Sequence, residues 1–131
     1  MIVADASALV DLLLNRPGGS RTAAALARER TVHAPHLAET EVLSALRRWV
    51  GRGELAPERA ASALDDLAAL PLARHAHHPL TPRIWALRER LSAYDATYVA
   101  LAEVLEATLV TADRRLARAA AKLLPSILLA S

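Results

Sequence analysis

The feature of this sequence that most limits its fold is the alternation of short strand-like runs with longer helical segments. Each short run has four or five residues, the length of a buried strand, and the segments between the runs have helical periodicity. The expected strands are Met1–Ala4, Thr31–Ala34, Leu72–Ala76, Thr108–Thr111 and Ser126–Ala130. Because strands that alternate with helices favour crossover connections, the pattern predicts an α/β fold with a parallel sheet and helices on both faces.

Turn-forming residues separate the expected helices. Pro17-Gly18-Gly19 ends the first helix, and Gly51-Arg52-Gly53 ends the most strongly periodic one. The expected helices are Ala6–Leu14, Ser20–Arg30 with Ser20 as its N-cap, His36–Val50, Pro57–Leu70, Pro79–Leu91, Tyr94–Ala107 and Asp113–Ala121. The sequence contains no internal repeat or low-complexity segment, and its 131 residues predict a single domain over positions 1–131.

The composition excludes several classes of protein. The chain has no cysteine, which excludes disulfides, thiol catalysis and zinc sites with cysteine ligands. It has no phenylalanine and only two tryptophans and two tyrosines, so the core must be aliphatic. Base stacking on aromatic platforms is then not expected to dominate any contact with nucleic acid. We expect that the N-terminus is not a signal peptide, and no apolar run approaches the roughly 20 residues of a membrane span, so we expect a cytoplasmic protein.

Three acidic residues follow or adjoin the expected strands. Asp5 follows the first strand directly, Asp113 follows Thr108–Thr111 after one residue, and Asp95 lies in the first turn of a helix. In parallel sheets, functional groups gather beyond the carboxyl ends of the strands. Carboxylate oxygens there are suited to Mg2+ and to metal-assisted hydrolysis of phosphodiesters. The alternative for each acid alone is helix capping or a favourable contact with the helix dipole.

Helical spacing adds information about two further positions. Asp95 shares a helix face with Tyr98, Val99 and Ala102, so its carboxylate should point towards the body of the protein, where it needs a partner or a metal. On the helix His36–Val50, Glu39 and Glu41 flank the apolar stripe about equally, and periodicity does not choose between them. That stripe consists of Ala38, Val42, Ala45, Leu46 and Trp49.

Four segments of the chain contain motifs built around the candidate acids. The segments are Ile2–Val10, in which Asp5 follows an apolar strand; Glu41–Arg48, a glutamate followed by a helix that ends in basic residues; Tyr94–Ala102 around Asp95; and Leu109–Leu116, which contains Thr111-Ala112-Asp113. Together they resemble a known family, the PIN-domain ribonucleases of the VapC toxin type. Their order and spacing fit VapC toxins across essentially the whole chain. The resemblance selects Glu41 over Glu39.

The resemblance implies a three-layer fold with a central, mainly parallel sheet of about five strands. It implies an endoribonuclease that uses Mg2+ or Mn2+ and serves as the toxin of a type II toxin–antitoxin system. The implied acidic cluster is Asp5, Glu41, Asp95 and Asp113, supported by the hydroxyls of Ser7 and Thr111. A dication would relieve the repulsion among such carboxylates. The implied partners are an RNA substrate and a VapB-type antitoxin, and the implied assembly is a homodimer or a toxin–antitoxin hetero-oligomer.

Several other residues have candidate roles beside a simpler interpretation. Arg114 and Arg115 follow Asp113 and could bind substrate phosphates, as could Arg47, Arg48 and Arg52, although a solvated helix surface is the favoured interpretation for any single arginine. The histidines His75, His77 and His78 are expected to form a loop or strand-end cluster without a role. Trp49 and Trp85 are expected to pack in the core or in an interface.

Two alternatives to a ribonuclease follow from the same residues. A non-catalytic PIN-like module that binds RNA or protein would have the fold without the chemistry. A phosphatase of the haloacid dehalogenase type also begins with a strand and an aspartate, but it needs a second acid two residues later. Ser7 stands at that position, which disfavours the phosphatase.

Overall fold

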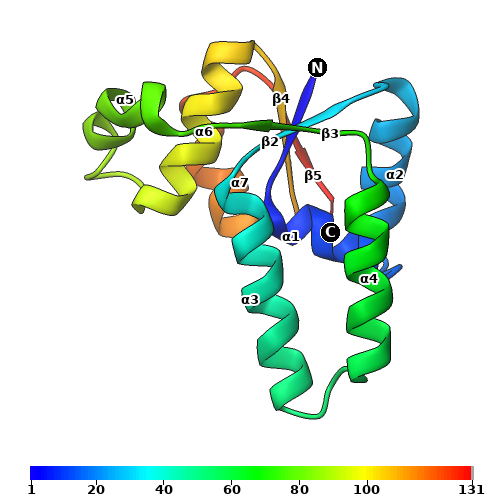
Figure 1. Cartoon of the computed structure of the whole chain (residues 1–131). Coiled ribbons are helices and arrows are strands. Elements are labelled where there is room, and N and C mark those ends of the chain that lie inside the picture. The colour runs from blue at the N-terminus through cyan, green and yellow to red at the C-terminus, as the bar shows by residue number, and fades with distance from the viewer. Residues whose placement is uncertain (131) are drawn as a thin grey trace.

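A five-stranded parallel sheet forms the centre of the structure, a computed structural model that describes residues 1–130 (Figure 1). The elements in chain order are β1 (Ile2–Ala4), α1 (Ala6–Leu13), α2 (Gly19–Arg28), β2 (Val32–Pro35), α3 (Leu37–Gly51), α4 (Pro57–Ala69), β3 (Leu72–His75), the 3-10 helix η1 (His78–Leu80), α5 (Thr81–Ala86), α6 (Ala93–Leu105), β4 (Thr108–Thr111), α7 (Arg114–Ala120) and β5 (Ile127–Leu129). All four strand pairings are parallel, which confirms the expected α/β class.

The order of the strands, β3-β2-β1-β4-β5, places the first strand in the middle of the sheet. Ile2, Val3 and Ala4 are all buried, as expected for a central strand covered on both faces. The chain builds outward from β1 to β2 and β3, then returns across the sheet to add β4 on the other side of β1. The strand order therefore reverses between β1 and β4, and such a reversal opens a crevice at the carboxyl ends of the two strands.

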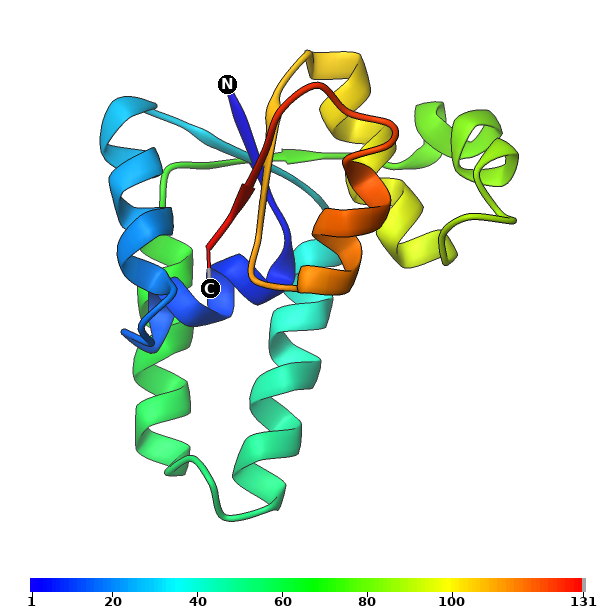
Figure 2. The same cartoon turned by 180° about the vertical axis from the view of Figure 1, so that it is seen from behind.

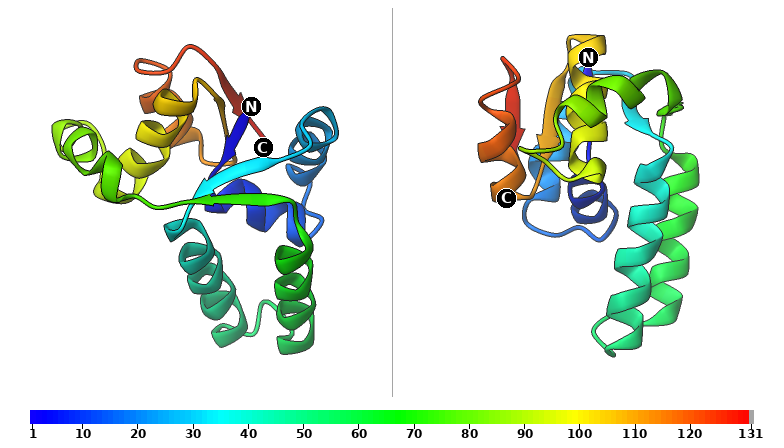
Figure 3. Two further views of the ribbon diagram at one scale, coloured as in Figure 1. Left: turned by 45° about the horizontal axis from the view of Figure 1, so that its top comes forward. Right: turned by 90° about the vertical axis from the view of Figure 1, so that its left-hand side faces the viewer.

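The helices form a layer on each side of the sheet (Figures 2 and 3). Helices α1 to α4 lie on one side, and α5, α6 and α7 lie on the other. This division follows from right-handed crossovers, because the chain moves one way across the sheet through β3 and the opposite way afterwards. The core between the layers is aliphatic as expected, and Tyr98 is the one aromatic side chain buried in it among the described residues.

Helices α3 and α4 extend together well beyond the edge of the sheet (Figure 3, right). The face of α3 that carries Ala38, Val42 and Leu46 is buried, in agreement with the predicted apolar stripe. Ala45 and Trp49 are partly buried and pack against the same core. Because α1 contacts both α3 and α4, the base of this helical pair is joined to the carboxyl end of β1.

Two helix predictions were wrong in detail. The expected helix Pro79–Leu91 is divided into η1, α5 and a series of turns, because Pro82 lacks the N–H that a helix starting at Pro79 would need there. Ser20 is not an N-cap, since α2 begins at Gly19 and the Ser20 hydroxyl donates to the Pro17 carbonyl at 3.1 Å. Within residues 1–130, no helix is long and apolar enough to cross a membrane.

Candidate active site

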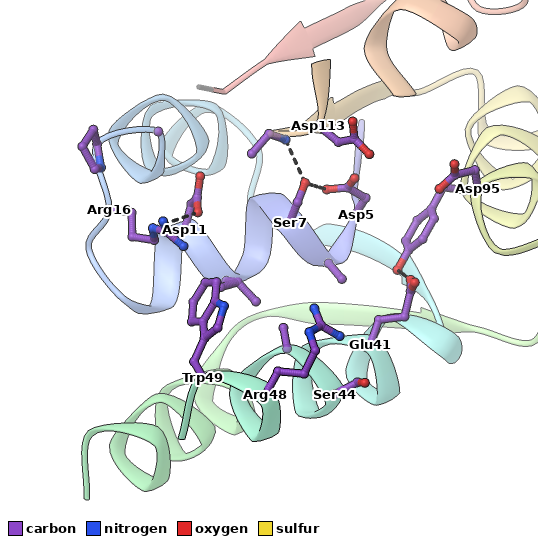
Figure 4. A pocket seen from close by; sticks show the side chains of 17 residues that line it. Asp5, Ser7, Asp11, Arg16, Glu41, Ser44, Arg48, Trp49, Asp95 and Asp113 are labelled. Carbon is purple, nitrogen blue, oxygen red and sulfur yellow. Dashed lines mark hydrogen bonds and ion pairs between the residues drawn. The ribbon is translucent and has the colours of Figure 1, made fainter. Parts of the chain in front are cut away.

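Four carboxylates from separate segments line one pocket of about 700 Å³ (Figure 4). Asp5 follows β1, Glu41 lies on α3, Asp95 lies in the first turn of α6, and Asp113 follows β4. The pocket is at the carboxyl ends of β1 and β4, where the strand order reverses. The fold thus brings together all four acids that the family resemblance implied.

Asp5 is the most buried of these acids, with 5% of its surface exposed. Its Oδ1 accepts the Ser7 hydroxyl at 2.7 Å and the Ala8 backbone N–H at 2.9 Å, and its Oδ2 accepts the Thr111 hydroxyl at 2.6 Å. Burial nevertheless raises the pKa of Asp5 from 3.8 to about 6, since desolvation outweighs these hydrogen bonds and the charge of Asp113 adds to the rise. Asp5 therefore has a strong electrostatic preference for a cation beside it.

The hydroxyls of Ser7 and Thr111 connect Asp5 to the segment that carries Asp113. Ser7 Oγ accepts the Ala112 backbone N–H at 2.9 Å, and Thr111 Oγ1 accepts the Asp113 backbone N–H at 3.0 Å. Each hydroxyl uses its single proton for Asp5 and a lone pair for the backbone after β4. The two residues thereby fix the position of Asp5 relative to the end of β4.

Asp113 combines a capping contact with a place at the pocket. Its Oδ1 caps α7 by accepting the backbone N–H groups of Arg115 at 2.9 Å and Leu116 at 3.2 Å. Asp5 likewise caps α1 through the Ala8 N–H. Each aspartate can therefore cap a helix and contribute to the pocket at the same time, because a capping carboxylate keeps oxygen lone pairs for a second partner.

Arg115 connects two of the acids. One of its guanidinium nitrogens lies 2.8 Å from Asp95 Oδ2 and 3.3 Å from Asp113 Oδ2. The Asp95 side chain is 16% exposed and faces the pocket, as its helical spacing predicted. A positive charge is thus already held between these two carboxylates. Arg114, the arginine that precedes it in the chain, is exposed and does not line the pocket.

The two glutamates on α3 have different surroundings, which periodicity alone did not distinguish. Glu41 lines the pocket, and its Oε1 accepts the hydroxyl of the buried Tyr98 at 2.5 Å. Burial raises the pKa of Glu41, opposed by this hydrogen bond and assisted by the charge of Asp95. Glu39 forms an ion pair with Arg74 on β3 and does not line the pocket. Only Glu41 shares a pocket with the three aspartates.

The other half of the pocket is lined by residues from α1, from the loop after it and from the outer turns of α3. Arg48 was a candidate for phosphate binding, whereas Asp11, Arg16, Ser44 and Trp49 were not predicted as site residues. Helical spacing could have found some of them, since Asp11 lies one turn after Ser7, and Arg48 lies two turns after Glu41. Arg47 and Arg52 were candidates for phosphate binding together with Arg48, but they do not line the pocket.

The donor set of the acidic half suits a hard cation. All four acids offer carboxylate oxygens, and Ser7 and Thr111 hold the most buried of them in place. Within residues 1–130, no three acidic or histidine side chains already converge as a complete ligand set. Arg115 and Tyr98 are the present partners of Asp95, Asp113 and Glu41, so these side chains would have to reorient around an ion.

The histidines and Trp85 lie outside the pocket. His33 Nδ1 and His75 Nε2 are 2.9 Å apart on the neighbouring strands β2 and β3, while His77 and His78 are exposed. His75 is thus paired with His33. Trp85 is 67% exposed and lies with its ring 4.7 Å from the Arg88 guanidinium carbon, so it does not pack in the core, and its expected place in an interface stays a prediction.

Comparison with known proteins identifies relatives along most of the chain. The family model described as PIN domain matches residues 2–122. VapC ribonuclease Mb0985 from Mycobacterium bovis (strain ATCC BAA-935 / AF2122/97) is 47% identical over 116 residues, which are 88% of this chain and 88% of the relative. Ribonuclease VapC1 from Mycobacterium tuberculosis (strain ATCC 25618 / H37Rv) is 43% identical over 118 residues, 89% of each chain.

Solved structures have the same fold. The crystal structure of PAE2754 from Pyrobaculum aerophilum has a TM-score of 0.73 at 25% identity and covers 96% of this chain and 81% of its own. The structure of VapBC2 from Rickettsia felis, bound to a DNA fragment from the promoter, has a TM-score of 0.68 at 19% identity and covers 98% of this chain and 97% of its own. From the family match and the relatives above 40% identity, the chain belongs to the PIN-domain family and, within it, to the VapC group.

Proposed function

We propose that this chain is the toxin of a type II toxin–antitoxin pair and that it is a metal-dependent endoribonuclease, which hydrolyses phosphodiester bonds in RNA. The observation that carries the proposal is the placement of Asp5, Glu41, Asp95 and Asp113, from four segments of the chain, around one pocket. The names of relatives such as Ribonuclease VapC1 support the same activity. Buried carboxylates with raised pKa values are unfavourable for stability alone, which supports a functional reason for keeping them together.

We propose Mg2+ or Mn2+ as the cofactor, held by Asp5, Asp95, Asp113 and Glu41. When bound, such an ion supplies Lewis acidity and an activated water for phosphodiester hydrolysis. The hard oxygen donors and the positive charge that Arg115 already places between Asp95 and Asp113 support a cation at this position.

The residues of the chain have separate tasks in this proposal. Ser7 and Thr111 keep the Asp5 carboxylate oriented, and Tyr98 does the same for Glu41. With an ion held by Asp95 and Asp113, the Arg115 guanidinium would be released from these carboxylates and could bind a substrate phosphate. One of the carboxylates accepts the proton of the attacking water, because no histidine or lysine lines the pocket within the described residues.

The proposed partners are RNA as the substrate and a VapB-type antitoxin as the inhibitor. An acidic pocket attracts an arginine of a partner protein, and this would block the site. The Rickettsia felis neighbour is VapBC2 bound to a DNA fragment from its promoter, and the shared fold supports the same type of pairing here. We further propose that the toxin forms a homodimer or a hetero-oligomer with the antitoxin, and that it acts in the cytoplasm.

Cleavage of purified RNA tests the function directly. The wild-type protein should cut RNA in Mg2+ or Mn2+ and lose this activity in EDTA, and its expression should arrest growth. Asp5→Asn and Asp95→Asn should abolish both effects, while Glu39→Gln, a change on α3 outside the pocket, should keep them. Metal-independent cleavage would refute the metal-dependent mechanism, and absence of any cleavage would favour a non-catalytic binding module.

A further inference from the structure

The half of the pocket farther from the acids carries positive charge. We call the three side chains Arg16, Arg48 and Trp49 the arginine wall; all line the same pocket as the four acids (Figure 4). The chain as a whole has a formal net charge of only +2, so a polyanion must be attracted by local groupings of this kind. The four carboxylates repel a phosphate backbone until they are neutralised, which makes a nearby positive wall useful for retaining it.

Arg16 is held in a defined orientation. Its guanidinium carbon lies 4.7 Å from the centre of the Trp49 ring, and its Nε lies 3.7 Å from Asp11 Oδ1. The Arg16 side chain is 49% exposed, so one side of it rests on the tryptophan while much of the rest is open to solvent. A planar guanidinium fixed in this manner can stack on a nucleobase, which compensates for the scarcity of aromatic residues in this chain.

Arg48 is available for a ligand. It lines the pocket, and Figure 4 draws no hydrogen bond or ion pair between its guanidinium and the other residues that line it. Arg48 lies two helical turns after Glu41 on α3, which places the two residues about 10 Å apart along the helix axis. At this separation, a strand whose scissile phosphate lies at the acids would present a neighbouring nucleotide to Arg48.

We propose that the arginine wall is a second RNA subsite, in which Arg48 binds the phosphate of a nucleotide next to the cleaved bond and Arg16 stacks on a neighbouring base. This inference rests on the proposed ribonuclease function. RNA is favoured over an acidic peptide because the wall and the acids share one pocket and because a flat, tryptophan-backed guanidinium matches a base. Single-stranded RNA fits best, since recognition of this type needs bases that are not stacked in a helix.

Binding of a short, fluorescently labelled single-stranded RNA of mixed sequence, measured over a series of salt concentrations, tests the subsite. The measurement uses the Asp5→Asn protein so that the RNA stays intact. Arg48→Ala should weaken binding roughly tenfold and reduce the slope of log K against log salt by about 0.7, the value for one lost contact with a single strand. Arg47→Ala removes the same charge from the adjacent exposed position outside the pocket and should change neither quantity.

A second variant tests the stacking contact. Arg16→Lys keeps the charge but removes the planar group, so it should weaken binding with little change in the salt slope. Thermal melts of each variant show that the fold is retained. If Arg48→Ala has the same RNA affinity and salt slope as Arg47→Ala, the phosphate subsite is refuted. If Arg16→Lys binds RNA as tightly as the parent protein, the stacking contact is refuted.

The outcomes separate this inference from the proposed function. If the wild-type protein cleaves RNA in Mg2+ but Arg48→Ala and Arg16→Lys leave RNA binding unchanged, the function stands and the subsite is overturned. If antitoxin binding depends on the arginine wall while RNA binding does not, the wall is a protein interface and the inference is again overturned. If the wild-type protein never cleaves RNA but binds it through Arg48 and Arg16, the RNA subsite is supported, the ribonuclease function is refuted, and the protein is a non-catalytic binding module.

Discussion

Replacing Asp5 with asparagine should make the stability of the metal-free protein less dependent on pH. The pKa of Asp5 is raised from 3.8 to about 6 in the folded state, mainly by burial. At 1.36 kcal/mol per pH unit, keeping this carboxylate ionised costs the folded state about 3 kcal/mol. The stability that protonation provides is complete below the unfolded pKa and is lost as the pH rises through about 6. A neutral amide at this position would carry no such cost.

The assay is thermal or urea unfolding of both proteins in EDTA at about pH 4 and about pH 7.5. Any imperfect hydrogen bonding of the new amide to Ser7, Ala8 or Thr111 is the same at both pH values and cancels in the comparison. The gain of Asp5→Asn over wild type should be larger at the higher pH by up to about 3 kcal/mol, or roughly 10 °C in Tm. Asp65→Asn, the same change on α4 away from the pocket, controls for loss of a carboxylate elsewhere. A pH-independent difference would refute the reasoning.

Three further predictions concern the partners of the acids. Arg115→Ala should increase the affinity for Mn2+ in calorimetry because it removes the cation that competes for two of the carboxylates, whereas Arg114→Ala should change it less; equal affinities in all three proteins would contradict this. Tyr98→Phe removes the hydrogen bond to Glu41 and should raise the pKa of that carboxyl further, so the activity-against-pH profile should shift towards higher pH; an unchanged profile would mean that the bond does not hold Glu41 in its charged form. Glu41→Gln should reduce metal-dependent cleavage by about tenfold or more, and Glu39→Gln should reduce it by less than about twofold, with equal losses excluding Glu41 as a ligand.

Much of the fold could be predicted from the sequence because the three central strands, β1, β2 and β4, are largely buried. A strand such as Ile2–Ala4 must be apolar throughout, and turn residues such as Gly51 and Gly53 mark where the helices stop. The start of α2 was missed because it depends on tertiary packing. A side chain on Gly18 would collide with the Ala130 carbonyl, and one on Gly19 would collide with the Asp11 carbonyl. Such distant contacts leave no local signal.

The candidate site could be predicted only in part. The strand-end rule pointed to Asp5 and Asp113 from the residues themselves, but the choice of Glu41 over Glu39 needed the family resemblance. The structure gives the physical basis for the distinction, since Glu41 meets Tyr98 from α6 while Glu39 meets Arg74 on β3. Both partners are distant in sequence, so periodicity within one helix could not reveal them.

The bridging role of Arg115 and the position of Arg16 were also beyond the reach of the sequence. Each arginine is one of many in a chain with a single lysine, and its role depends on which side chains lie within a few ångströms. Arg115 contacts Asp95 across a gap of 20 residues, and Arg16, in the loop after α1, stacks on Trp49 of α3. The oriented charges of the pocket therefore come from the packing of α1, α3, α6 and α7 around the ends of β1 and β4.

The most direct measurement of the central claim is anomalous diffraction from crystals of the wild-type protein grown with Mn2+. We predict a manganese peak inside the pocket, coordinated by Asp5 and at least one of Glu41, Asp95 and Asp113, with the Arg115 side chain moved away from its present carboxylate partners. Crystals saturated with Mn2+ that show no ion among these four acids would contradict the account.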